Sequence, residues 1–164
     1  MTDSPFWRFS LRFYALDGVA PACLALQDEG GADVNVLLLL LYLAEERLLM
    51  TAADTGRLDA TIAVWREEAV KPLRALRRRL KMGIGGIPPA AAESFRNQIK
   101  KVELEAERLE QAFLEREAAS LRLAQAQTRE AAAEANLSAY GAFLGGLPDN
   151  PLKIVLQAFT VSPP

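Results

Sequence analysis

The longest uninterrupted run of apolar residues in the chain extends from Val36 to Ala44, VLLLLLYLA. A helix that is apolar on every side has no face for solvent, so it belongs in the centre of a bundle or in a membrane. The run is too short for a membrane span, which needs about 20 apolar residues. Asp33 is a suitable N-cap, and the pattern therefore predicts a buried central helix over residues 33–53.

Two shorter helices are predicted before this central helix. Ser4 and Pro5 form a typical helix start, with a hydroxyl cap followed by proline. In the resulting helix, over about 5–15, three aromatic residues share one face: Phe6, Phe9 and Phe13. We expect this face to pack onto the central helix. A second helix is expected over about 19–28, where Val19, Cys23 and Leu26 share a face before Gly30 and Gly31 end it.

A long helical hairpin is predicted after the central helix. Residues 54–56 suggest a turn and Asp59 is the expected cap of a helix over 59–82, in which Pro72 should disturb the hydrogen bonding near Ala69. The segment 83–89, GIGGIPP, cannot be helical and marks a boundary. A second helix over 90–118 should then return antiparallel to the first.

The returning helix carries a regular seam of apolar residues. They are spaced 3, 4, 3 and 4 residues apart: Ile99, Val102, Ala106, Leu109 and Phe113. Such spacing is typical of a helix-packing seam, either within the bundle or at the surface of a homo-oligomer. Residues 118–136 are compatible with a continued helix or with a turn, whereas 136–144 and the segment from Pro151 are again predicted to be helical.

The fold class that follows is all-α. We expect a single-domain bundle of six to seven helices around the central one, over residues 1–161, with 162–164 as a tail. Apolar residues make up 51% of the 164 residues and charged residues 24%, which suits a folded domain with a substantial core.

The sequence contains no catalytic signature. It has no histidine, which excludes Ser-His-Asp and Cys-His arrangements and ordinary zinc sites. We therefore predict no catalytic residue, no metal ligand and no cofactor, and the sequence favours a protein that is not an enzyme. With a net charge of −2 and a pI of about 5.3, bulk charge does not favour nucleic acid as a partner. The polar start predicts no signal peptide, so we expect a cytoplasmic protein without membrane association.

The densest charged segment is KPLRALRRRLK, residues 71–81. Its six positive charges are Lys71, Arg74, Arg77, Arg78, Arg79 and Lys81. Six glutamates follow between Glu103 and Glu117, with only two arginines among them. The basic segment therefore either pairs with the chain's own acidic helix or binds an external anion or partner protein. Our first functional hypothesis is a protein-interaction bundle, adaptor or regulatory, that uses the basic segment or the helix over 90–118.

An alternative hypothesis is a bundle, with or without enzymatic activity, that binds a small molecule or lipid in a pocket between the helices over 5–15 and 33–53. Its polar contacts would be Asp28, Asn35 and Tyr42, and its apolar lining would include Phe9, Phe13 and Leu38. Asn35 stands out because it precedes so apolar a run. The simpler, purely structural interpretation is that Asn35 forms a hydrogen bond between helices, that Tyr42 and Trp65 lie in the core, and that Cys23 is a buried thiol.

Three motifs in the first third of the chain resemble a known family. They are FWRFSLRFY at Phe6–Tyr14, GVAPACLALQD at Gly18–Asp28, and GADVN at Gly31–Asn35. The pattern is similar to that of a family of uncharacterised bacterial proteins, and the resemblance extends over about residues 5–115. It implies a cytoplasmic bacterial protein of unknown function and carries no catalytic residues with it.

Overall fold

The structure is a computed structural model that describes residues 4–163. It confirms the all-α fold: apart from two strands of two residues each, the regular structure of these residues is helical. Their contacts group into two units, residues 4–59 with 111–163, and residues 60–110. The expectation of a single domain over 1–161 stays a prediction, and Met1–Asp3 and Pro164 lie outside the described residues.

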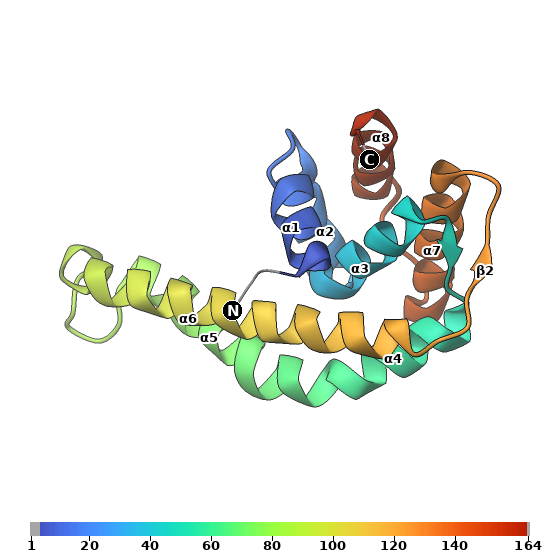
Figure 1. Cartoon of the computed structure of the whole chain (residues 1–164). Coiled ribbons are helices and arrows are strands. Elements are labelled where there is room, and N and C mark those ends of the chain that lie inside the picture. Colours follow the sequence, from blue (N-terminus) through green and yellow to red (C-terminus); the bar gives the residue numbers. More distant parts are fainter. Residues whose placement is uncertain (1–3, 164) are drawn as a thin grey trace. The chain divides into compact units, whose positions relative to one another are not determined.

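The first unit contains most of the helices (Figure 1). Its elements are α1 (Pro5–Tyr14), α2 (Val19–Gly30), α3 (Val34–Glu45), β1 (Leu48–Leu49), β2 (Ala124–Gln125), α7 (Arg129–Leu144) and α8 (Asp149–Val161). The second unit is a helical hairpin made from the end of α4 (Ala52–Trp65), η1 (Arg66–Val70), α5 (Lys71–Met82) and most of α6 (Pro89–Ala119). Helices α4 and α6 continue from one unit into the other.

Helix α3 is the centre of the first unit, as its sequence predicts. Its side chains from Asn35 to Leu41 are all buried, and it packs mainly against α7 and also against α1 and α2. The carboxylate of Asp33 caps the helix, because it accepts hydrogen bonds from the backbone N–H groups of Asn35 (2.8 Å) and Val36 (3.4 Å). The predicted cap and the predicted burial are both confirmed.

The predicted end of the central helix, Ala53, is wrong. Helix α3 ends at Glu45, and Arg47 adopts a left-handed backbone conformation with φ of 59°. The chain then forms β1, which pairs antiparallel with β2. The next helix begins at Ala52 and runs through residues 54–56, where a turn was expected. Its first turn is capped by Thr51 rather than Asp59: the Thr51 hydroxyl accepts from the Asp54 N–H at 3.0 Å.

Asn136 of α7 holds this irregular segment in place. Its side-chain oxygen accepts a hydrogen bond from the Met50 N–H at 2.7 Å, and its side-chain nitrogen donates to the carbonyls of Leu40 (3.1 Å) and Leu48 (3.0 Å). The side chain is fully buried. One amide thus satisfies three backbone groups around the exit from α3, which is why the chain can leave the helix inside the core.

The aromatic face of α1 packs as predicted. Ser4 caps the helix by accepting from the Trp7 N–H at 3.1 Å. The Phe6 ring stacks on Tyr42 of α3 at a centroid distance of 5.3 Å, and Phe9 lies 5.7 Å from the same ring. Phe13 makes an edge contact with Phe159 of α8 at 6.2 Å. Helix α1 is therefore fixed to α3 and α8 by aromatic contacts.

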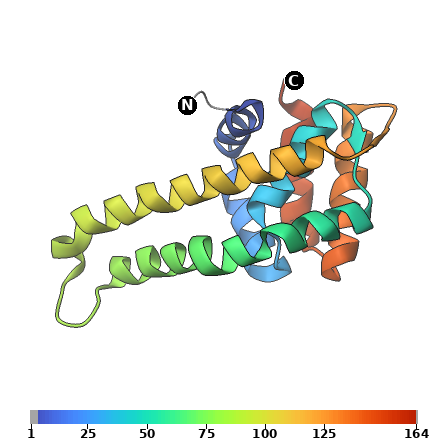
Figure 2. The same cartoon turned by 60° about the horizontal axis from the view of Figure 1, so that its bottom comes forward.

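The hairpin interrupts its first helix at the predicted place. Residues 66–70 form a π-helical segment, η1, and Pro72 follows in the first turn of α5. A wider turn before proline accommodates the missing N–H and the bulk of the ring. A short loop, with a bridge between Ile84 and Ile87, connects α5 to α6. Figures 1 and 2 both show α5 running beside the first part of α6.

No single helix among the described residues is long and apolar enough to cross a membrane, and α1 with α2 reaches that composition only as a pair bent by 99°.

Cys23 of α2 provides a test of the first unit's packing. The thiol is fully buried, and burial raises its pKa from 9.0 to about 12. We expect it to react with a thiol reagent at pH 8 at least about 1,000-fold more slowly in the native protein than in denaturant. The rate is measured from the absorbance of the coloured thiolate that the reagent releases when it reacts with Cys23. Equal rates in the two conditions would contradict the packing of α2.

The same shift fixes the direction of a pH effect. Because the folded-state pKa is raised, the contribution of this group to stability is present below pH 9 and is lost as the pH rises toward 12. The loss is at most about 4 kcal/mol. In a Cys23→Ala variant, the free energy of unfolding should therefore not decrease between pH 9 and pH 12 by the part that the thiol causes.

Candidate functional site

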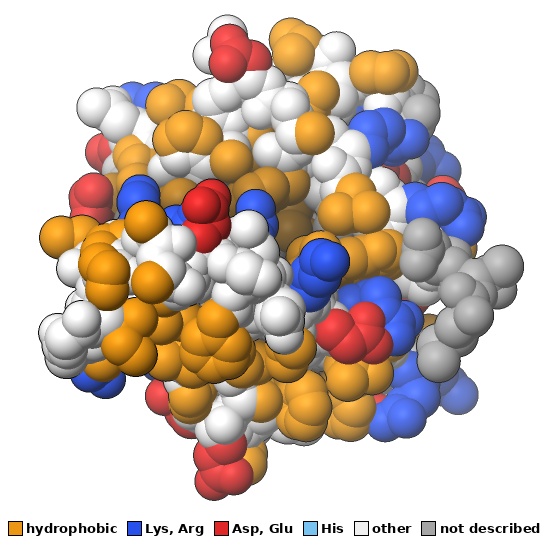
Figure 3. Space-filling view, turned by 90° about the vertical axis from the view of Figure 1, so that its left-hand side faces the viewer, with side chains coloured by type: hydrophobic (Ala, Val, Ile, Leu, Met, Phe, Trp, Pro, Cys, Tyr) orange, Lys and Arg blue, Asp and Glu red, His pale blue; other side chains and the backbone are white. Residues whose placement is uncertain are grey.

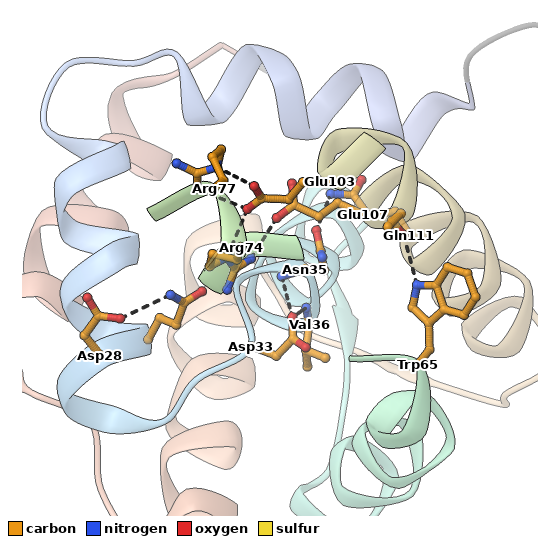
Figure 4. Close-up of polar contacts among 12 residues, drawn as sticks. Asp28, Asp33, Asn35, Val36, Trp65, Arg74, Arg77, Glu103, Glu107 and Gln111 are labelled. Atoms are coloured by element: carbon orange, nitrogen blue, oxygen red, sulfur yellow. Dashed lines mark hydrogen bonds and ion pairs between the residues drawn. The ribbon is translucent and has the colours of Figure 1, made fainter. Parts of the chain in front are cut away.

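Part of the basic segment pairs with the chain's own acidic helix. The guanidinium of Arg74 donates to Glu107 at 2.7 Å and to Glu103 at 3.3 Å. Arg77 donates to both carboxylate oxygens of Glu103, in one case at 3.1 Å. Figure 4 shows both arginines of α5 pointing toward the two glutamates of α6. These contacts confirm that α5 and α6 are antiparallel.

Burial strengthens this network electrostatically. Glu103 is buried and the side chain of Arg74 is 19% exposed. Burial by itself would lower the pKa of Arg74, but the hydrogen bonds and charges of Glu107 and Glu103 outweigh it and raise that pKa above its ordinary value. Arg74 therefore stays charged, and its charge is paired with Glu103 and Glu107 inside the hairpin.

The six basic candidates thus have three different environments. Arg74 and Arg77 form the internal network, and Lys71 pairs with Glu67 one turn earlier at 2.6 Å. The side chains of Arg78, Arg79 and Lys81 are exposed. The sequence left internal pairing and external binding as alternatives, and the structure assigns the first to Arg74 and Arg77.

Charge is unevenly distributed between the two units. The hairpin, residues 60–110, contains eleven basic and seven acidic residues, a net charge of +4, whereas the rest of the chain has a net charge of −6. The excess lies near the loop: residues 78–101 contain six basic residues and one acidic residue, Glu93. The net charge of −2 for the whole chain therefore conceals a strongly basic hairpin end.

An apolar stripe lies on the exposed surface of α6. It consists of Phe95, Val102 and Leu109, which are spaced seven residues apart and are 50%, 52% and 44% exposed. Within the predicted seam, Ala106 is buried, whereas Val102 and Leu109 are exposed. The use of this seam at the surface of a homo-oligomer, the other alternative, stays a prediction. The buried positions of this helix lie beside the predicted seam and include Ala92, Glu103 and Glu110. We use the name apolar stripe for Phe95, Val102 and Leu109.

Trp65 of α4 lies beside this stripe and not in the core, where the sequence placed it. The indole is 39% exposed, and its N–H donates to the carbonyl of Ala106 at 3.0 Å. Ala106 lies in the turn of α6 that also contains Leu109. The hydrogen bond fixes a large, partly exposed aromatic side chain, which is a typical feature of protein-binding surfaces.

Figure 3 views the molecule from the side on which the hairpin loop lies, and it shows hydrophobic side chains interspersed with Lys and Arg side chains. Met82 at the end of α5 and Ile87 in the loop are among the most exposed apolar residues of the hairpin. Apolar and basic side chains are therefore both available at this end.

The candidate pocket residues have different environments. Asn35 is buried, and its side-chain oxygen accepts a hydrogen bond from the Gln111 side chain of α6 at 2.8 Å. This is the hydrogen bond between helices that the purely structural interpretation of Asn35 predicts. Asp28 is exposed on α2, accepts from the Gln27 side chain at 3.2 Å, and lies apart from Asn35 in Figure 4. The structure therefore does not bring Asp28 and Asn35 together.

Tyr42 lies two turns after Asn35 on α3 and is half-buried. Burial is the main cause that raises the pKa of Tyr42, and the charges of Glu115 and Glu46 raise it further. Glu115 also accepts from the Phe6 N–H at 3.3 Å. The expected lining residues Phe9, Phe13 and Leu38 are all buried, and the rings of Phe9 and Phe13 stack at 5.6 Å. This region has the contacts of a packed core.

Three relevant residues were not identified from the sequence. Phe95 continues the heptad spacing backward from Val102, so the sequence did contain its signal. Gln111 and the exposed position of Trp65 have no such signal, because both depend on which neighbouring helix lies opposite.

Among residues 4–163, no group of three or more Cys, Asp and Glu residues has an arrangement that could hold a metal ion.

A comparison with known protein families found a match to a family described as a protein of unknown function (DUF2390), over residues 5–114. The matched range agrees with the resemblance stated from the sequence motifs, and it includes both the network of α5 and α6 and the apolar stripe. Comparisons with curated proteins and with solved structures found no match.

Proposed function

The chain belongs to the DUF2390 family of proteins of unknown function, and we propose that it is a non-enzymatic cytoplasmic protein-interaction bundle whose hairpin binds a partner protein. The observation that carries this proposal is the apolar stripe on α6. Three large apolar side chains in a row on one helix are costly to leave in water, since each exposes area that burial would stabilise by about 25 cal/mol per Å².

Trp65 supports the same assignment. Tryptophan is enriched among the residues that dominate binding energy at protein interfaces, and an indole already held by a hydrogen bond loses little conformational freedom on binding. The small-molecule alternative has weaker support, because its proposed polar contacts are separated and its proposed lining is buried.

The proposal is tested by photo-crosslinking in the protein's own cells. A photoreactive amino acid replaces Gln98, which is exposed and lies one turn from the stripe, and in a control it replaces Asn97, which is exposed on another face of α6. We expect a crosslinked protein of defined mass from position 98 and not from position 97. Mass spectrometry then identifies that protein.

Two matched variants show whether the stripe is responsible. Val102→Glu is expected to reduce the crosslink at least about tenfold, since it places a charge in the centre of the apolar contact. Leu104→Glu is the control, because Leu104 is also exposed, at 47%, on the same helix but on another face. Equal crosslinking in both variants, or crosslinking from both positions, would contradict the proposal.

A further inference from the structure

The hairpin has an incomplete hydrophobic core. Its buried apolar residues are Ile62, Val70, Leu80, Ala92 and Ala106, and two glutamates, Glu103 and Glu110, occupy buried positions one heptad apart on α6. Two antiparallel helices cover only one face of each other. Helical proteins complete such a core by adding a third helix.

One side of the hairpin is open to a third helix. Arg74 and Arg77 of α5 reach Glu103 and Glu107 across one side. The helical spacing of α5 places three other residues on the opposite side: Pro72, Leu76 and Arg79. By the same spacing, the apolar stripe of α6 faces this opposite side, next to Trp65. We call the apolar stripe together with Pro72, Leu76 and Arg79 the open face.

The length and charge of the open face indicate what covers it. From Phe95 to Leu109 the stripe extends about 21 Å at 1.5 Å per residue, which corresponds to about four helical turns. The surrounding end of the hairpin, residues 78–101, has a net charge of +5. A second copy that used the same face would bring two such charges together, which is unfavourable. An acidic partner is favoured instead.

Resting on the proposed function, we infer that the open face binds an acidic amphipathic helix of a partner protein, which completes a three-helix unit with α5 and α6. The apolar side of that helix packs between the stripe and Leu76. Its carboxylates pair with Arg79 and with the other exposed cations near the loop. This mode of binding is the helix-in-groove recognition common to amphipathic segments.

The inference is tested with designed peptides and the full chain. The probe is a fluorescein-labelled 21-residue peptide with leucine at heptad positions a and d and glutamate at most other positions. Its control is an isomer of identical composition whose leucines are spread over all faces. Fluorescence anisotropy is expected to show at least tenfold weaker binding of the isomer, and affinity for the probe should fall as salt increases.

Variants of the chain separate the apolar and the charged contributions. Val102→Glu should abolish binding of the probe, and Leu104→Glu should leave it unchanged. Arg79→Glu should weaken binding about tenfold, whereas Arg122→Glu, which changes the net charge equally at an exposed position outside the hairpin, should leave it unchanged. Equal binding of probe and isomer, or equal effects of Arg79→Glu and Arg122→Glu, would overturn the inference.

Two other occupants would also overturn it. If sedimentation shows a dimer that Val102→Glu dissociates, the open face binds a second copy. If the chain binds vesicles containing 30% phosphatidylserine and not the peptide, the face binds an anionic membrane. A crosslinked partner at position 98 together with no peptide binding would preserve the proposed function and reject the acidic helix, while peptide binding without any crosslink would reject the proposed function.

Discussion

Replacing Asn136 with leucine is expected to lower the free energy of unfolding by about 4 kcal/mol. Its amide satisfies three backbone groups, the Met50 N–H and the carbonyls of Leu40 and Leu48, all at distances of 3.1 Å or less. Leucine has nearly the same shape and no polar atoms. It would leave these groups without their partner inside the core, where water does not replace the lost bonds easily.

Urea unfolding followed by circular dichroism measures this effect. The matched control is Ser138→Leu, two residues later on α7 at an exposed position, which should change the free energy of unfolding by less than about 0.5 kcal/mol. If Asn136→Leu lowered stability by no more than the control does, Asn136 would not be the residue that holds the exit from α3.

Replacing Glu103 with alanine is expected to lower the stability of the hairpin by about 3 kcal/mol. Glu103 is buried and accepts from both Arg74 and Arg77. Without it, both arginines lose a carboxylate that they share, and the two guanidinium groups remain close together. Breaking a buried pair by removing one partner is costly for this reason, even where the intact pair contributes little net stability.

The fluorescence of Trp65 during urea unfolding, in a Trp7→Phe background, reports on the hairpin. Glu105→Ala is the matched control, since Glu105 also pairs with an arginine, Arg108 at 2.6 Å, but on the surface; it should leave the unfolding midpoint unchanged. Added sulfate should stabilise Glu103→Ala more than the unchanged protein, because an anion can replace the missing carboxylate beside the two guanidinium groups. A sulfate effect equal in both proteins would contradict the internal network.

The burial of α3 could be predicted from the sequence because nine consecutive apolar residues leave no alternative. Its end could not. Leu48, Leu49 and Met50 are apolar and continue the helical pattern, but the backbone turns at Arg47 because β2 and Asn136 supply hydrogen bonds to the segment that follows. These partners lie more than 70 residues away in the chain, so no local pattern contains them.

The hairpin was predicted for similar local reasons, since GIGGIPP ends one helix and starts the next. The antiparallel direction of α6 was predicted, but the rotation of this helix about its own axis was not. The seam through Val102 and Leu109 and the buried line through Glu103 and Glu110 differ by a rotation of about 100°. Hydrophobicity favours the first line, whereas in the structure Arg74 and Arg77 of α5 pair with Glu103 on the second.

The candidate site was predictable only as a set of alternatives. Arg74 and Arg79 are indistinguishable in the sequence, and their different roles depend on which side of α5 faces α6. Asn35 was a candidate because a polar side chain is unusual in such apolar surroundings. Its hydrogen bond with Gln111 explains how this side chain is accommodated there without a ligand.

Hydrogen exchange measured by mass spectrometry, on the chain alone and in complex with the partner protein identified by crosslinking, tests the central claim most directly. The account predicts slower exchange on binding in α5 and in residues 95–109 of α6, with no change in α2 or α3. Slower exchange confined to the helices of the first unit, with none in the hairpin, would contradict it.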